Sequence, residues 1–149
     1  MGNILNDDFI DFLKFFNQFQ VDYILVGGYA VIFHGYNRTT GDLDVWVKPT
    51  VNNYRKMLLA FKAFGLSPFN MTENLFLNLD ENDVFTFGMP PVCIDILTKV
   101  KGLDFDNVFI NSSMVKFDGL DVKMIDIRDL KNAKKAAGRA KDIDDLEHL

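Results

Sequence analysis

Two aspartates lie two residues apart at the start of an otherwise apolar segment. Asp42 and Asp44 flank Leu43 and are followed by Val45-Trp46-Val47. If residues 43–47 form a strand, side chains alternate between its faces, so both carboxylates lie on one face. Neighbouring carboxylates raise each other's pKa unless a cation lies between them. Carboxylates are common ligands of Mg²⁺, so the pair predicts a divalent-metal site.

A third aspartate lies in a segment that is otherwise apolar. Asp95 belongs to residues 92–97, which read as a strand. A buried carboxylate is costly unless it is paired or metal-bound. If this strand adjoins the strand of Asp42 and Asp44, the three carboxylates converge. Such a triad can hold two metal ions about 3.5–4 Å apart, an arrangement suited to in-line phosphoryl or nucleotidyl transfer.

A glycine pair separates a short apolar run from a short helical segment. Gly27 and Gly28 follow residues 23–26, which read as a buried strand, and precede residues 29–34, which read as a helix closed by Gly35. Glycine lets backbone approach a ligand closely, and a helix start offers free N–H groups to an anion. The pair therefore predicts a phosphate cradle, although it matches neither the Walker A nor the GxGxxG pattern.

The remaining elements follow from hydrophobic periodicity and turn residues. Strands are expected at 23–26, 43–47, 84–87, 92–97, 114–117 and 120–124, and helices at 7–20, 29–34, 54–64 and, with a break at Gly138, in 126–149. Asp118-Gly119 predicts a tight hairpin. Residues 66–82 are the least defined, with an extended piece at 75–79. Alternating strands and helices followed by a hairpin indicate an α+β domain with a mixed sheet.

Composition narrows the classes of protein. A chain of 149 residues suits one domain, here 1–149, and 48% hydrophobic residues exclude a disordered chain. The single cysteine, Cys93, excludes an internal disulfide and a thiolate zinc site. A net charge of −5 argues against broad binding to nucleic acid or an anionic membrane. No segment resembles a membrane span or a secretory signal, so a cytoplasmic location is expected.

The order of these motifs resembles a known superfamily. Strand, Gly27-Gly28, short helix, Asp42-Leu43-Asp44 and a later single Asp95 on a strand are similar to nucleotidyltransferases built like the palm of DNA polymerase beta. The closer resemblance is to small stand-alone prokaryotic members, including those of toxin–antitoxin and abortive-infection systems. It extends to residues 34–44, HGYNRTTGDLD, and to the tail at 137–146, AGRAKDIDDL.

The resemblance implies a fold and an activity. The fold is a mixed β-sheet with helices packed on one face and a helical C-terminal tail. The activity is Mg²⁺-dependent transfer of a nucleoside monophosphate from a nucleoside triphosphate, with ATP expected, to a hydroxyl on an unknown acceptor: a small molecule, a protein or tRNA. Asp42, Asp44 and Asp95 become the catalytic residues and the ligands of a two-ion site.

It also implies a nucleotide-binding set, which consists of Gly27, Gly28, Arg38 and Lys141. For two of these residues a simpler reading stays open. Arg38 also fits an exposed loop cation, and Lys141 also fits the solvated face of a charge-rich helix.

One departure from the family pattern supports an alternative function. Many members have Gly-Ser where this chain has Gly27-Gly28, so a hydroxyl that contacts a phosphate is missing. In addition, no acceptor-binding domain is visible. The alternative is an interaction protein of the same fold with little or no catalysis, such as the antitoxin of a toxin–antitoxin pair, bound to a partner toxin.

Overall fold

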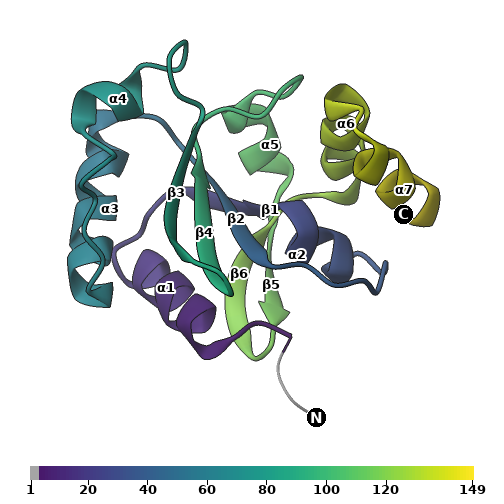
Figure 1. Ribbon diagram of the computed structural model, residues 1–149, viewed down its shortest axis with the longest axis horizontal. Helices are drawn as coiled ribbons and strands as arrows, with labels where there is room; N and C mark the ends of the chain where they lie inside the picture. The colour runs from purple at the N-terminus through teal and green to yellow at the C-terminus, as the bar shows by residue number, and fades with distance from the viewer. Residues whose placement is uncertain (1–3) are drawn as a thin grey trace.

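The computed structural model describes residues 4–149, which form a six-stranded mixed sheet and seven helices (Figure 1). The strand order is β3-β4-β2-β1-β6-β5. The strands are β1 (Tyr23–Val26), β2 (Asp42–Val47), β3 (Val84–Met89), β4 (Val92–Leu97), β5 (Ser113–Phe117) and β6 (Leu120–Met124). The helices are α1 (Asp7–Gln18), α2 (Gly27–Phe33), α3 (Val51–Phe64), α4 (Glu73–Leu77), α5 (Phe105–Asn111), α6 (Ile127–Ala137) and α7 (Ala140–His148).

The centre of the sheet combines parallel and antiparallel pairs. β2 pairs in parallel with β4 and antiparallel with β1, while β1 pairs in parallel with β6. The outer hairpins β3–β4 and β5–β6 are antiparallel. Asp118 and Gly119 turn the second hairpin with positive φ angles of 52° and 78°, as the sequence predicts. The predicted mixed sheet is therefore confirmed, and so is the adjacency of the two aspartate-bearing strands.

The two long helices cover one face of the sheet and enclose an aromatic core (Figure 1). Phe61 of α3 lies 5.7 Å from Phe12 of α1 and 5.0 Å from Phe87 of β3, between ring centroids. Leu43 and Val45, the residues that alternate with the aspartates on β2, are fully buried. This apolar face forces the alternate residues of β2 toward the opposite face of the sheet.

The opposite face is partly covered by α5, in a segment for which the sequence predicts no element. The Phe105 ring packs edge-on against Trp46, with 5.3 Å between centroids. Because Trp46 shares a face with Asp42 and Asp44, α5 covers one end of that face and leaves the acidic end open. The expected one-sided packing holds for α1 and α3, and α5 adds a contact on the second side.

The predicted extended piece at 75–79 is wrong, because residues 73–77 form the short helix α4. The Thr72 hydroxyl accepts a hydrogen bond from the Leu75 amide and so caps the helix start. Phe76 is fully buried against Tyr54, whereas Leu77 is exposed. The Thr72 N-cap and the burial of Phe76 favour a helical turn here, so the alternating apolar residues at 75–79 do not form a strand.

The C-terminal helices form the tail that the sequence predicts. Gly138, in the left-handed conformation with φ 65°, ends α6 and lets α7 turn back on it. In Figure 1 the two helices lie on the side of the sheet away from α1 and α3. Over residues 4–149, no helix has both the length and the apolar character needed to cross a bilayer.

The aromatic core provides the first prediction. Phe61→Ala removes a fully buried ring that contacts two others, and it should lower the free energy of unfolding by about 3–5 kcal/mol. Leu59→Ala, at a half-exposed position of the same helix, is the control and should cost less than about 1 kcal/mol. Urea unfolding measures both. A similar loss in both variants would mean that the α1–α3 layer is not the core.

Candidate functional site

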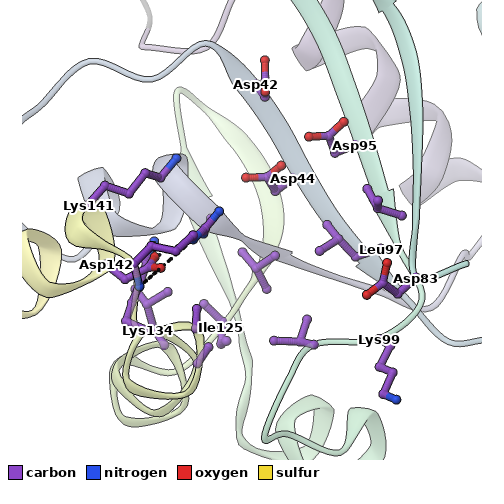
Figure 2. Close-up of a pocket in the computed structure, with 18 residues that line it drawn as sticks. Asp42, Asp44, Asp83, Asp95, Leu97, Lys99, Ile125, Lys134, Lys141 and Asp142 are labelled. Carbon is purple, nitrogen blue, oxygen red and sulfur yellow. Dashed lines mark hydrogen bonds and ion pairs between the residues drawn. The ribbon is translucent and has the colours of Figure 1, made fainter. Parts of the chain in front are cut away.

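The parallel ladder between β2 and β4 brings the predicted acidic residues to one place. Asp44 lies directly opposite Asp95, and Asp42 lies opposite Cys93, one pleat repeat along the strand. All three aspartates line a cavity of about 410 Å³ at the open end of the sheet (Figure 2). The sequence predicts this convergence, and the register of the two strands produces it.

The electrostatics of the acidic pair call for a cation. Burial, together with the adjacent Asp95 carboxylate, raises the pKa of Asp44 to about 7. Asp42 raises this pKa further, whereas the Lys141 ammonium lowers it. The Thr86 hydroxyl donates to Asp95 Oδ1 at 2.7 Å and fixes that carboxylate. A cation bound between the two facing carboxylates would relieve their repulsion and favour the charged form of Asp44.

The residues fit Mg²⁺, and the facing carboxylates of Asp44 and Asp95 are the two ligands that the fold already brings together. Their oxygens are the ligand type that Mg²⁺ prefers. Within residues 4–149, no group of three or more His, Cys, Asp or Glu side chains is gathered closely enough to hold a metal ion. Figure 2 shows why, because the Asp42 carboxylate lies apart from the other two. Asp42 is exposed and lies on the same face of β2 as Asp44.

The two glycines have different surroundings. Gly27 lines the cavity, and a Cβ there would collide with the Asp44 carboxylate. Its φ of 70° also favours glycine. Gly28 is buried and does not line the cavity; a Cβ there would collide with the Thr40 side chain. The helix begins at Gly27, so the glycines are its first two residues, and only Gly27 borders the acidic residues.

The predicted cations are separated by the fold. Lys141 lines the cavity. In Figure 2 its side chain extends from α7, across the cavity from Asp42 and Asp44. Arg38 does not line the cavity. Its guanidinium binds the buried Asp145 carboxylate, with Nε 2.7 Å from Oδ1 and Nη2 3.0 Å from Oδ2. The structure therefore brings Lys141 to the aspartates and places Arg38 against the C-terminal helix.

Three further basic residues line the cavity outside the predicted set, Lys99, Lys134 and Arg139, together with the acidic Asp83 and Asp142. Lys99 lies two residues beyond Leu97, where β4 ends, so only its closeness to the Asp95 strand in the sequence was a usable signal. Lys134 and Arg139 come from α6 and the turn before α7, and only the tertiary fold places them here. Apolar residues form much of the remaining lining, among them Val84, Leu97, Val100 and Leu130.

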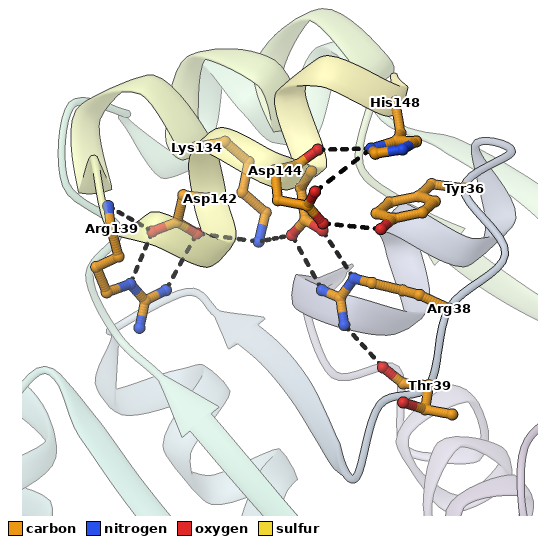
Figure 3. Close-up of polar contacts among 9 residues, drawn as sticks. Tyr36, Arg38, Thr39, Lys134, Arg139, Asp142, Asp144 and His148 are labelled. Atoms are coloured by element: carbon orange, nitrogen blue, oxygen red, sulfur yellow. Dashed lines mark hydrogen bonds and ion pairs between the residues drawn. The ribbon is translucent and has the colours of Figure 1, made fainter.

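Buried ion pairs attach α7 to the wall of the cavity (Figure 3). Lys134 Nζ lies 3.2 Å from Asp142 Oδ1 and 2.9 Å from Asp145 Oδ2, and Arg139 Nε lies 2.7 Å from Asp142 Oδ2. Burial raises the pKa of both carboxyls, but hydrogen bonds from Arg139, Arg38 and Lys134 outweigh it and hold both pKa values below their usual range.

Comparison with known proteins supports the fold. No protein-family model matches the sequence, and no curated protein matches it. Among solved structures, the lincosamide antibiotic adenylyltransferase LnuA, in its lincomycin-bound form, aligns over 99% of this chain and 97% of its own, with a TM-score of 0.52 and 14% sequence identity. The chain therefore shares the fold of this adenylyltransferase over nearly its whole length, in agreement with the nucleotidyltransferase fold that the resemblance implies.

The paired carboxylates predict a metal-dependent gain in stability. Millimolar Mg²⁺ should raise the melting temperature of the wild type, since a ligand of the folded state stabilises it by mass action. Asp44→Asn removes one charge of the facing pair and should reduce that shift, whereas Asp121→Asn, at an exposed position of β6, should keep it. Differential scanning fluorimetry with and without Mg²⁺ measures the shifts. Equal shifts in wild type and Asp44→Asn would contradict the metal site.

The buried ion pairs predict a pH dependence of stability. A carboxyl whose pKa is lowered by folding stabilises the protein above its unfolded pKa, and this contribution is lost as pH falls through the folded pKa. Lys134→Met leaves two buried carboxylates with one cation each. It should cost about 3–5 kcal/mol at pH 7.

The deficit of Lys134→Met should shrink as pH falls below about 4 toward the lowered pKa values of Asp142 and Asp145, because a protonated carboxyl no longer needs the cation. Urea unfolding at pH 7, 5 and 3.5 tests this. Lys116→Met breaks an exposed pair with Asp121 and is the control, with a loss under about 1 kcal/mol at each pH. A Lys134→Met deficit that is independent of pH would contradict the assignment.

Proposed function

We propose that this protein is a Mg²⁺-dependent nucleotidyltransferase that transfers a nucleoside monophosphate from a nucleoside triphosphate to an acceptor hydroxyl. The observation that carries the proposal is the pairing of Asp44 with Asp95 across β2 and β4, beside Gly27 and in a cavity that Lys141 also lines. A module used only for binding has no need of facing carboxylates, which destabilise the metal-free fold by repulsion.

The proposed metal ligands are Asp42, Asp44 and Asp95, in a two-ion site. Bound there, Mg²⁺ would supply Lewis-acid neutralisation of the phosphate charge. Asp95 is the proposed proton acceptor for the attacking hydroxyl, because the Thr86 hydroxyl orients its carboxylate. As that proton leaves, the acceptor oxygen bonds to the α-phosphorus, the bond to the bridging oxygen breaks, and pyrophosphate departs.

The cations and Gly27 have supporting roles. Gly27 lets the Asp44 carboxylate lie directly against the backbone at the start of α2, since a side chain there would collide with that carboxylate. Lys141 and Arg139 line the same cavity and neutralise the charge that builds on the departing pyrophosphate. Catalysis of this kind rests on positioning and charge stabilisation, so a small scaffold suffices.

The donor and the acceptor class rest on two supports. The aligned solved structure is an adenylyltransferase, which supports ATP as the donor. The cavity of about 410 Å³ has apolar lining beyond the aspartates and favours a small hydroxyl compound over a macromolecule as the first acceptor to screen.

Asp95→Asn tests the proposal. The change keeps the shape of the side chain but removes the proton acceptor, so it acts more on the transition state than on nucleotide binding. ATP–Mg²⁺ affinity, measured by calorimetry, should stay within a few-fold. Transfer of labelled nucleotide to the acceptor, in a metabolite extract or lysate of the source cell, should fall by about 10²-fold or more.

Asp121→Asn, at an exposed position of β6, is the matched control and should transfer label like the wild type. If neither wild type nor control labels any molecule with any of the four nucleoside triphosphates, the interaction-protein alternative replaces this proposal. Search for a bound partner toxin would then be the next experiment.

A further inference from the structure

Helix α7 faces the rest of the protein mainly with charge. Its two buried residues are Asp142 and Asp145, exposed by 0% and 1%, whereas its apolar Ile143 is 52% exposed. Burying carboxylates with their cations is a poor route to stability, since well-packed apolar residues often stabilise as much or more. What directional ion pairs do provide is one defined position for the helix.

Arg38 supplies the longest-range of these pairs. It lies four residues before Asp42, in the segment that leads into β2, and reaches a helix 107 residues further along the chain. Its planar fork contacts both oxygens of Asp145, which restricts rotation as well as distance. The third donor group, Nη1, binds the Thr39 carbonyl oxygen at 2.9 Å. Each of the three guanidinium nitrogens therefore has a protein partner, which uses three of its five N–H groups.

A second contact supports the same junction. The Tyr36 hydroxyl donates to Asp144 Oδ2 at 2.7 Å, and the Tyr36 ring stacks on His148 with 4.0 Å between centroids (Figure 3). Tyr36 and Arg38 come from one segment, and Asp144 and His148 come from one helix. The segment that leads into the acidic strand is thus joined to the last helix between Asp144 and His148, over about one turn of α7.

The position of Lys141 follows from this junction. Lys141 immediately precedes Asp142, and Asp145 lies one helical turn further on. The segment before β2 therefore leads directly to Asp42 and Asp44. Through the Arg38–Asp145 pair, it also contacts the helix that carries Lys141.

We propose that Arg38 is a positioning residue, which holds α7 through Asp145 so that Lys141 stays beside the acidic cavity, and that it does not itself contact the nucleotide. The proposal rests on the proposed function for the role of Lys141. It replaces the direct phosphate contact that the sequence predicts for Arg38, because the guanidinium lies outside the cavity lining and its nitrogens are engaged.

A double-mutant cycle tests the proposal with ATP and Mg²⁺ as the probe. Arg38→Gln and Lys141→Ala should each weaken binding about tenfold by calorimetry, the loss expected for one charge-assisted contact. The double variant should bind within about twofold of Lys141→Ala, since Arg38 acts through Lys141. Asp145→Asn should reproduce Arg38→Gln, and Arg38→Lys, which keeps the charge but not the fork, should lie between wild type and Arg38→Gln.

Two binding results would overturn the proposal. Additive losses of Arg38→Gln and Lys141→Ala would mean that Arg38 contacts the nucleotide directly, and an unchanged affinity in Arg38→Gln would mean that the ion pair has no positioning role. Lys116→Gln, at the exposed pair with Asp121, is the matched control and should bind like the wild type.

A second measurement does not depend on nucleotide binding. Amide hydrogen exchange in residues 140–148 should be faster in Arg38→Gln than in the wild type, with exchange in α1 and α3 unchanged. Faster exchange in α7 with no ATP binding by the wild type would uphold the positioning contact and refute the proposed function. Unchanged exchange in α7 would refute the positioning role, whatever the wild type binds.

Discussion

The site depends on the repulsion between two carboxylates that face each other across a parallel strand pair. Asp44 and Asp95 cannot separate, because hydrogen bonds of the β2–β4 ladder fix the register and the apolar residues beside them are buried on the other face. One answer to that repulsion is protonation: burial, and after it the Asp95 carboxylate, raise the pKa of Asp44 to about 7. The other is a cation, and the open cavity in front of the pair admits one.

The two faces of the sheet divide the work of stability and chemistry. Aromatic side chains from α1 and α3 cover one face and supply the apolar burial that holds the strands together. On the other face, α5 closes one end by packing Phe105 on Trp46, and the acidic end is bordered by α6 and α7. Apolar burial on the first face therefore offsets the electrostatic repulsion between the aspartates on the opposite face.

The helices that border the acidic end are attached differently from those of the core. Lys134 is buried between two carboxylates, and the pKa values of both partners are lowered by hydrogen bonds despite burial. Such pairs add little net stability, but they have one correct geometry, whereas apolar contacts tolerate small shifts. This suits a segment whose charged side chains must lie at fixed distances from a reacting group.

The sequence by itself determined the six strands, the helices other than α4 and α5, and the acidic residues, because their signals are local. Alternation on residues 43–47 placed Asp42 and Asp44 on one face, an isolated Asp95 marked the third carboxylate, and Asp118-Gly119 gave the hairpin. Only the tertiary structure decided the rest, because it depends on contacts between distant segments. It placed Gly27 against Asp44 and Gly28 against Thr40, so that only the first glycine borders the acidic residues. It also paired Arg38 with Asp145, 107 residues away, and not with a phosphate site, and no local pattern specifies that partner.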